Sequence, residues 1–179
     1  MKKLMLPEKG IVCACIKTSM GWLAYAVSSK GLKECRFMFE TKKDAEDTLK
    51  AIFNENELHS DESVSEKWSE LFVKYFAGKL KSFAKTPLDT SSWTDFSKKV
   101  YGAVKSIPYG RTASYGAVAS YLGNEKASRA VGNALKRNPV PPVVPCHRVI
   151  AADKELCGFS ANGGLDLKLK MIEMERSNP

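Results

Sequence analysis

The sequence lacks most of the features that would place a protein in a membrane or outside the cell. Its longest apolar stretch, residues 11–27, is interrupted by Lys17, Thr18 and Ser19 and cannot span a bilayer. The basic amino terminus precedes an apolar run of only three residues, which is too short for a secretory signal peptide. The five cysteines are irregularly spaced, so we expect reduced thiols rather than a disulfide framework. These absences predict a cytoplasmic protein, or a nuclear one in a eukaryote, with no membrane partner.

Acidic residues are outnumbered by basic ones. The chain has 28 Lys and Arg against 20 Asp and Glu, which gives a net charge of +8 and a pI near 9.2. This surplus favours a polyanionic partner, although many basic proteins have none. With 44% hydrophobic and 27% charged residues, the composition is that of a folded globular protein and argues against a disordered or collagen-like chain.

The amino-terminal half has the pattern of a small sheet with helices. The predicted elements are two strands joined in a hairpin, a third strand and two helices, at residues 11–16, 22–27, 34–39, 41–53 and 64–76. Cys13 and Cys15 would share one face of the first strand as small core residues. Because this half contains no constellation of reactive groups, we expect residues 1–85 to form a scaffold domain.

The carboxy-terminal half changes to a helical pattern. Residues 79–92 are basic and polar, and we expect a linker there, with the second domain covering residues 86–179. Four helices are predicted, at residues 93–107, 114–121, 127–136 and 165–175. In the last of these, Leu165, Leu169 and Ile172 form the predicted apolar face. The sequence thus predicts an α+β protein with a three-stranded sheet in its first domain and a mainly helical second domain.

Two of these helices, joined by residues 122–126, have the dimensions of a helix-turn-helix. The core-facing stripe of the second helix consists of Ala127, Ala130, Val131, Ala134 and Leu135. The opposite face consists of Arg129, Gly132, Asn133 and Lys136. This face offers two cations, an amide and no bulky group, so it can lie close to a DNA backbone or groove. Any helical hairpin can show this pattern, so a hairpin without a DNA partner is the alternative.

A thiol, an imidazole and a guanidinium follow one another at Cys146, His147 and Arg148, within the stretch VPPVVPCHRVI of residues 140–150. The three prolines fix φ and remove backbone donors, which predicts a stiff, extended approach to the thiol. Cysteine reacts as the thiolate, and nearby cations lower the pKa of a thiol. A rigid, buried segment with one thiol beside basic groups therefore suits a nucleophile. A buried structural cysteine on a core strand is the alternative.

Three segments together resemble the signature of the O6-alkylguanine-DNA alkyltransferase family. They are Ser128-Arg129-Ala130-Val131-Gly132, Arg137-Asn138-Pro139-Val140-Pro141 and Pro145-Cys146-His147-Arg148-Val149. With Ser114-Tyr115 and Gly163-Gly164-Leu165, the resemblance covers most of the chain after about Trp93, whereas the amino-terminal half matches only in general layout. It implies a ribonuclease H-like first domain, a winged-helix-like second domain, and repair of O6-alkylguanine, or of O4-alkylthymine, in double-stranded DNA.

The resemblance also implies that the protein acts as a monomer and needs no cofactor. The zinc ion that some relatives carry is not expected, because only His59 remains outside the signature as a histidine ligand. The loop of residues 158–162 is slightly longer than the commonest form, and Phe159 occupies a position where many relatives have tyrosine.

Individual residues acquire roles from the same resemblance. Arg129 would take the place of the extruded base, Tyr115 would contact the flipped guanine, and Asn138 would be a hinge between the two motifs. Glu175 would complete a hydrogen-bond chain with His147. The other residues expected to bind DNA or the guanine are Ser128, Gly132, Asn133, Lys136, Pro141, Val149 and Ser160.

The implied reaction is displacement at the alkyl carbon by the Cys146 thiolate, after the base has been flipped out of the duplex. Neighbouring side chains of an extended chain point to opposite sides, so a water molecule is expected between Cys146 and His147, with Glu175 raising the basicity of the imidazole. The thioether product has no easy hydrolytic exit, so each event would consume one protein molecule. A DNA-binding sensor without repair activity and a cysteine hydrolase are the alternatives.

Overall fold

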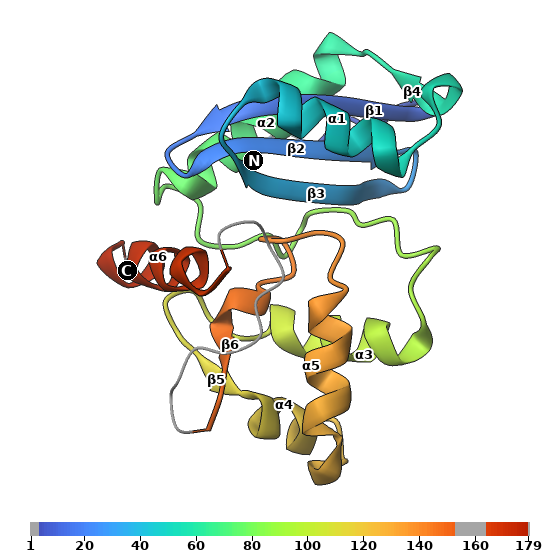
Figure 1. Ribbon diagram of the computed structural model, residues 1–179. Coiled ribbons are helices and arrows are strands. Elements are labelled where there is room, and N and C mark those ends of the chain that lie inside the picture. Colours follow the sequence, from blue (N-terminus) through green and yellow to red (C-terminus); the bar gives the residue numbers. More distant parts are fainter. Residues whose placement is uncertain (1–3, 153–163, 179) are drawn as a thin grey trace. The chain divides into compact units, whose positions relative to one another are not determined.

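The chain divides into two compact units, Met1–Asp89 and Thr90–Pro179, in a computed structural model that describes residues 4–152 and 164–178. Figure 1 shows a sheet with helices in the first unit and mostly helices in the second. This is the α+β arrangement expected from the sequence, and the boundary between the units lies four residues after the predicted one. Within the described ranges, none of the helices combines the length and hydrophobicity that a membrane span requires.

The first unit is built around a four-stranded sheet with the order β3-β2-β1-β4. Strand β2 (Gly21–Ser28) pairs antiparallel with both β1 (Ile11–Thr18) and β3 (Gly31–Phe39), and short turns join the three strands. A fourth strand, β4 (Leu58–His59), follows a 3-10 turn and pairs in parallel with β1. The prediction of three strands was therefore wrong, because two residues are too few to produce an alternating pattern.

Helix α1 (Lys42–Ile52) covers one face of this sheet. It begins where the Thr41 hydroxyl accepts a hydrogen bond of 3.1 Å from the backbone nitrogen of Asp44, at the position that the sequence predicted. Its Ala45 and Leu49 are buried in one cluster with apolar residues of β1 and β2, and Cys13 and Cys15 pack against the same cluster. The two thiols therefore do share one face of β1.

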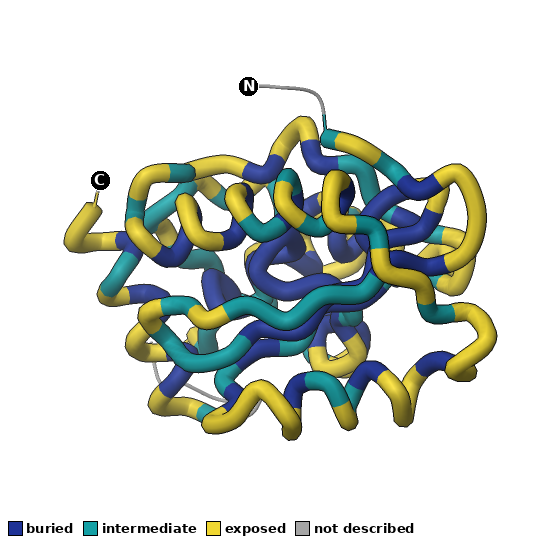
Figure 2. The backbone as a smooth tube through the Cα atoms, turned by 90° about the horizontal axis from the view of Figure 1, so that it is seen from above, coloured by how far each residue is buried: buried dark blue, intermediate teal, exposed yellow. Residues whose placement is uncertain are grey.

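Helix α2 (Glu62–Phe76) covers the opposite face. The ring of Tyr25 in β2 lies 5.3 Å from that of Phe72, between ring centroids, and the Tyr25 hydroxyl donates a hydrogen bond of 2.7 Å to the carbonyl of Ser65. The buried residues of this helix all lie in the range 64–76 where the sequence predicted a helix, and they are Val64, Trp68, Leu71, Phe72, Tyr75 and Phe76. Figure 2 shows the result: the middle of the sheet is buried, and buried and exposed residues alternate along the helices.

The second unit contains the four predicted helices. They are α3 (Asp95–Lys105), α4 (Tyr115–Tyr121), α5 (Ser128–Lys136) and α6 (Gly164–Ser177). Two short strands, β5 (Ala113–Ser114) and β6 (Val149–Ile150), pair in parallel. The buried Tyr101 hydroxyl of α3 donates a hydrogen bond of 2.9 Å to the Ala134 carbonyl, which joins α3 to α5.

The apolar face predicted for the last helix is wrong. Leu165 and Leu169 are 45% and 42% exposed, and Ile172 alone of the predicted three is buried. The buried residues of α6 are Leu167, Lys168, Met171, Ile172 and Glu175. This buried face contains two charged residues, so it is less hydrophobic than the face that the sequence favoured. It is nevertheless the face of α6 that packs against the core.

Gly31, at the start of β3, tests the backbone packing of the first unit. Its φ is +131°, and a Cβ atom there would lie 2.4 Å from the carbonyl group of Pro87. We expect Gly31→Ala to lower the free energy of unfolding, measured by urea denaturation, by roughly 1–3 kcal/mol from backbone strain alone. The matched control is Gly102→Ala in α3, where the added methyl meets open space and should raise stability by roughly 0.5–1 kcal/mol. Equal effects of the two substitutions would contradict this account.

Candidate functional site

The helix pair identified from the sequence consists of α4 and α5, with a 3-10 turn at Glu125–Ala127 between them. Helix α4 begins after Ser114, whose hydroxyl accepts a hydrogen bond of 3.0 Å from the backbone nitrogen of Ala117. The chain turns after this helix at Gly123, whose φ of +77° favours glycine. The cap lies at the first residue of the helix that the sequence predicted at residues 114–121.

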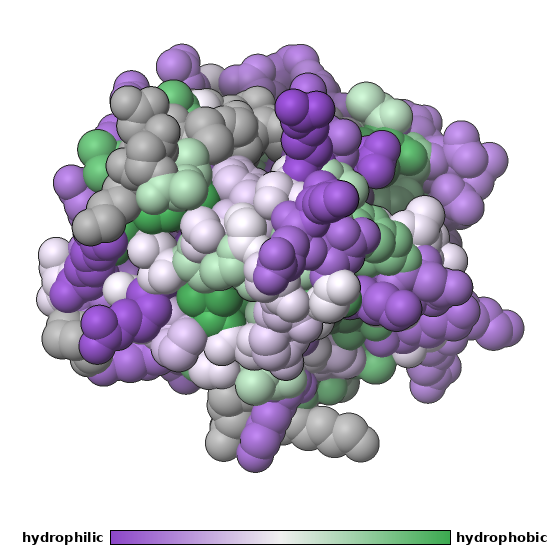
Figure 3. Space-filling model, turned by 90° about the horizontal axis from the view of Figure 1, so that it is seen from below, coloured by the Kyte–Doolittle hydropathy of each residue, from purple (hydrophilic) through white to green (hydrophobic). Residues whose placement is uncertain are grey.

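The outward face of α5 is polar. Arg129, Asn133 and Lys136 are exposed, and Gly132 is half-buried. Figure 3 views the molecule from the side of α4 and α5, and hydrophilic side chains cover much of that face. The residues predicted for this face are therefore accessible to a partner.

The inward face of α5 contains one departure from the predicted stripe. Ala127, Val131, Ala134 and Leu135 are buried, but Ala130 is exposed. An alanine methyl removes little apolar surface from water when it is buried, so hydrophobicity does not fix the place of a residue at the edge of the stripe.

Tyr115, the first residue of α4, packs against α5. A Cβ atom on Gly132 would be 3.7 Å from the Tyr115 ring, so glycine at that position lets the ring approach the helix closely. The ring is half-buried, and the Lys168 ammonium lies 5.7 Å from its centroid. Ser128, at the start of α5, is also half-buried and lies near Gly116 of α4.

Asn138 joins the end of α5 to the thiol segment. Its side-chain amide donates hydrogen bonds to the Val144 carbonyl at 2.8 Å and to the Cys146 sulfur at 3.3 Å. Its amide oxygen accepts a hydrogen bond of 3.1 Å from the backbone nitrogen of Val140. Asn138 is buried, as is Pro141 within the same loop, where the Pro141–Pro142 peptide bond is cis. One side chain therefore fixes both ends of the loop that carries the nucleophile candidate.

The prediction of an extended segment at the thiol is wrong. Cys146, His147 and Arg148 form a turn of 3-10 helix. Backbone hydrogen bonds from Val144 to Val140 (3.0 Å) and from Cys146 to Val144 (2.9 Å) bend the chain just before it. The φ angle that proline imposes fits a turn as well as an extended chain, so the prolines alone did not decide between them.

The carboxylate of Glu175 is the centre of a buried network. Its Oε1 lies 2.9 Å from His147 Nε2 and 2.8 Å from Arg148 Nη2, and its Oε2 accepts hydrogen bonds from Arg148 Nε at 2.9 Å and from the backbone nitrogen of Gly110 at 3.0 Å. Arg148 also donates to the Ile107 carbonyl at 2.7 Å. The structure thus brings Glu175 and His147 together, and it gives Arg148 a carboxylate partner that the sequence analysis missed.

Burial and nearby charges act in opposite directions on the two reactive groups. Burial raises the pKa of the half-buried Cys146 thiol, while the hydrogen bond from Asn138 and the positive charge of Lys168 lower this pKa. Burial lowers the pKa of His147, and the hydrogen bond to Glu175 raises this pKa. Glu175 acts in the direction expected from the sequence, but desolvation is the larger effect and the pKa of His147 is lowered overall.

Lys168 is the residue of this region that the sequence analysis overlooked. It is completely buried on the inward face of α6. A signal was present, because Lys168 precedes Glu175 by seven residues, or about two helical turns, and so lies on the same face of the helix. The assignment of Glu175 to the interior therefore already implied that Lys168 is inside.

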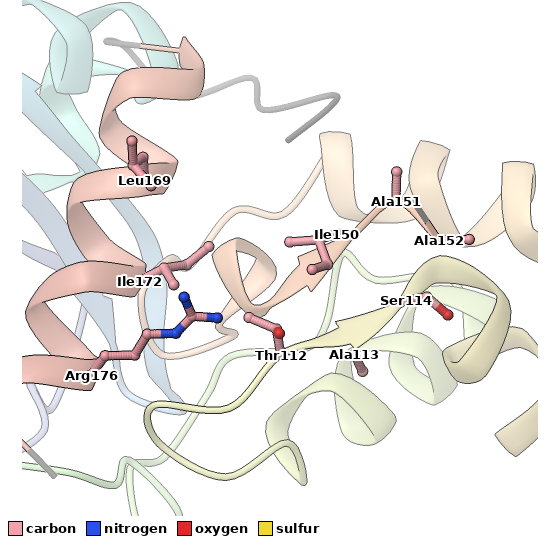
Figure 4. A pocket seen from close by; sticks show the side chains of 9 residues that line it. All are labelled: Thr112, Ala113, Ser114, Ile150, Ala151, Ala152, Leu169, Ile172 and Arg176. Carbon is pink, nitrogen blue, oxygen red and sulfur yellow. The ribbon is translucent and has the colours of Figure 1, made fainter. Parts of the chain in front are cut away.

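A pocket of about 570 Å³ lies between α6 and the two short strands of the second unit. Figure 4 shows Ile172 and Arg176 of α6 pointing toward Ile150 and Thr112. Neither Cys146 nor Tyr115 lines this pocket, so it is not the space in front of the thiol. Val149, predicted to contact the guanine, is buried, and Ser160 lies outside the described residues.

Fold and site together define a two-unit α+β protein in which a helix-turn-helix leads through one asparagine to a half-buried thiol. Residues 95–177 match the family described as 6-O-methylguanine DNA methyltransferase, DNA binding domain. The chain is 41% identical over 165 residues to a methylated-DNA–protein-cysteine methyltransferase of Methanosarcina acetivorans, covering 92% of this chain and 97% of that protein. It therefore belongs to the methylated-DNA–protein-cysteine methyltransferase family.

Solved structures give the same relationship. The crystal structure of the Mycobacterium tuberculosis O6-methylguanine methyltransferase has a TM-score of 0.75 and 32% sequence identity, over 94% of each chain. The M. tuberculosis protein in complex with DNA matches with the same TM-score and identity, over 93% of this chain and 94% of that one.

Replacement of the Glu175 carboxylate tests the buried network. We expect Glu175→Gln to lower the free energy of unfolding of the second unit by roughly 3–5 kcal/mol, because the Arg148 charge would stay buried without its anion. Glu173→Gln, on the exposed face of the same helix, is the control and should change stability by less than about 0.5 kcal/mol. Urea denaturation of both variants provides the measurement, and a loss no larger than that of the control would refute the structural role of the network.

Proposed function

We propose that the protein repairs O6-alkylguanine in double-stranded DNA by transferring the alkyl group to Cys146, once per protein molecule. As a member of its family, the chain is a DNA-repair methyltransferase that moves an alkyl group to a protein cysteine. The observation that supports Cys146 is its setting. The thiol accepts a hydrogen bond of 3.3 Å from Asn138, and the next residue, His147, is hydrogen-bonded to a buried carboxylate.

In the proposed reaction, the Cys146 thiolate attacks the alkyl carbon in line with the carbon–oxygen bond. A sulfur–carbon bond forms, the bond between the carbon and O6 breaks, and the electron pair passes to the guanine. The Tyr115 phenol supplies a proton to the departing base and is reprotonated from solvent, which in turn takes up the thiol proton accepted by His147. The thioether that remains on Cys146 has no hydrolytic exit, so the protein is consumed.

His147 is proposed to take the thiol proton through a water molecule. Its Nε2 is engaged by Glu175 at 2.9 Å, so Nδ1 is the ring nitrogen for this exchange. Burial lowers the pKa of His147, which favours the neutral ring, and the neutral ring has a lone pair to accept the proton. The resulting imidazolium would be stabilised by the Glu175 carboxylate.

The second unit is proposed to be the part that binds DNA, as a monomer and without sequence preference. Residues 90–179 hold 13 Lys and Arg against 7 Asp and Glu, so most of the net positive charge of the chain belongs to this unit. On α5, Arg129 is exposed and is proposed to fill the stack that the flipped base vacates. Asn133 and Lys136 would contact the backbone, and glycine at position 132 would permit close approach.

Label transfer tests the nucleophile directly. Incubation with duplex DNA that contains radiolabelled O6-methylguanine should place one label on each protein molecule, and mass spectrometry should locate it on Cys146. Cys146→Ala should abolish transfer and leave DNA affinity largely unchanged, because the thiol is small and half-buried. Label that is released into solution would indicate a hydrolase, and label that stays on DNA would indicate a sensor. Label on Cys13, Cys15, Cys35 or Cys157 would refute the assignment.

Arg129→Ala separates base flipping from chemistry. We expect this variant to repair a lesion in duplex DNA at least tenfold more slowly, corresponding to a loss of about 1.4 kcal/mol, because the flipped base would lack its replacement in the stack. Its reaction with free O6-benzylguanine, which needs no extrusion, should match that of the unmodified protein. Lys136→Ala is the control for the loss of one exposed cation of the same face. Equal duplex rates for the Arg129 and Lys136 variants at saturating protein would rule out the flipping role.

A further inference from the structure

One turn of the second unit contacts both partners of the buried ion pair between Arg148 and Glu175. It spans residues 107–110, between α3 and β5. The Ile107 carbonyl accepts a hydrogen bond of 2.7 Å from Arg148 Nη1. The Gly110 backbone nitrogen donates one of 3.0 Å to Glu175 Oε2, and a Cβ atom on Gly110 would lie 3.3 Å from the Glu175 carbonyl oxygen. The backbone of this turn is therefore packed tightly against the ion pair.

Tyr109, in the middle of the same turn, adds an aromatic contact. The central carbon of the Arg148 guanidinium lies 5.6 Å from the centroid of the Tyr109 ring, within the range of a cation–π interaction. The residue is half-buried, but its hydroxyl oxygen is buried, so the ring points inward. Burial raises the pKa of Tyr109, the charge of Glu175 raises it further, and the charge of Arg148 lowers it. The ring is thus close enough to the ion pair to sense both charges.

The position of Arg148 matters because Glu175 has one carboxylate for two partners. Arg148 Nη2 and His147 Nε2 both approach Glu175 Oε1, at 2.8 and 2.9 Å. A guanidinium held on the carboxylate balances its negative charge, so less of that charge acts on the imidazole. The placement of Arg148 therefore determines how strongly Glu175 favours protonation of His147.

We propose that Tyr109 is a positioning residue, whose ring holds the Arg148 guanidinium on Glu175 and so keeps the Glu175 carboxylate shared between Arg148 and His147. The hydrogen bonds of a guanidinium lie in its plane, and its faces are left for contacts such as an aromatic ring. The inference rests on the proposed function of His147 as the acceptor of the thiol proton. Tyr109 acts on that step through Arg148 and Glu175.

The sign of the effect is defined. Burial is the largest influence on His147 and lowers its pKa, Glu175 raises this pKa, and the charges of Arg148 and Lys168 lower it. A guanidinium that moves away from Glu175 therefore leaves His147 with a higher pKa. Water that enters in place of the ring reduces the burial of the imidazole and changes its pKa in the same direction. Loss of the Tyr109 ring should thus raise the pKa of His147.

The test is an NMR pH titration of the full chain, which contains only two histidines. His59, which is exposed in the first unit, is the internal reference. Tyr109→Leu should raise the midpoint of His147 by roughly half a pH unit or more. Where a midpoint lies below the working range, the protonated fraction of His147 at pH 5 is compared instead. Tyr109→Phe keeps the ring and should match the unmodified protein.

Hydrogen exchange at Arg148 reports on the guanidinium itself. Arg148 Nε lies 2.9 Å from Glu175 Oε2, to which it donates a hydrogen bond. The proton on this nitrogen should exchange roughly three- to tenfold faster in Tyr109→Leu, because the guanidinium would lose one of its contacts. In Tyr109→Phe the exchange rate should stay that of the unmodified protein.

Tyr101→Leu is the control for the loss of a buried ring. Tyr101 belongs to the same unit, where its ring lies 4.8 Å from that of Trp93 and its hydroxyl donates to the Ala134 carbonyl. This variant should lower the temperature of thermal unfolding, yet leave the titration of His147 unchanged. Tyr109→Met is the second variant without the ring, should Tyr109→Leu fail to fold.

An unchanged titration of His147 in a folded variant without the Tyr109 ring would overturn the proposal, as would an equal change in Tyr101→Leu or Tyr109→Phe. An exchange rate at Arg148 that is the same in all variants would overturn it as well. These measurements need neither DNA nor alkyl transfer. Failure of the proposed function, seen as label on a cysteine other than Cys146, is therefore distinct from failure of the role of Tyr109.

Discussion

The second unit depends on one buried carboxylate. Glu175 of α6 accepts hydrogen bonds from the turn before α4 through Gly110 and from the thiol segment through Arg148, and it meets the imidazole of His147. Three segments far apart in the sequence are thus fixed by two oxygen atoms. A buried anion with this many partners is costly to remove, because each partner would stay buried without its hydrogen bond or its opposite charge. The position of His147 follows from this network before any reaction begins.

Asn138 also fixes the position of the thiol segment, which the hydrogen bonds of Glu175 hold from the other end. Its amide binds Val140, Val144 and Cys146, so the loop that leaves α5 is closed onto the nucleophile candidate by one side chain. Helix α5 and the thiol are therefore linked by a short stretch of chain with little freedom. In the proposed reaction, the binding of α5 to DNA would therefore also bring the thiol to the base.

Sequence reasoning succeeded where a local signal was strong. The caps at Thr41 and Ser114 and the signature around Cys146 all depend on residues within a few positions of one another, and such relations can be read without a fold. It failed where tertiary contacts decided the outcome. The interior face of α6 contains Lys168 and Glu175, and hydrophobicity alone favours a neighbouring face. The burial of Glu175 depends on its hydrogen bonds with distant segments.

The thiol illustrates a general conflict between protection and reactivity. Enclosure in the protein raises the pKa of Cys146 and opposes formation of the thiolate. In the proposed reaction, the same enclosure would keep bulk water from the reacting carbon. A donor at 3.3 Å from Asn138 and a buried cation act against that rise. A turnover enzyme must also release its product, which limits how closely the nucleophile can be enclosed. A protein that keeps the alkyl group has no such limit, so its nucleophile can be contacted closely from several sides.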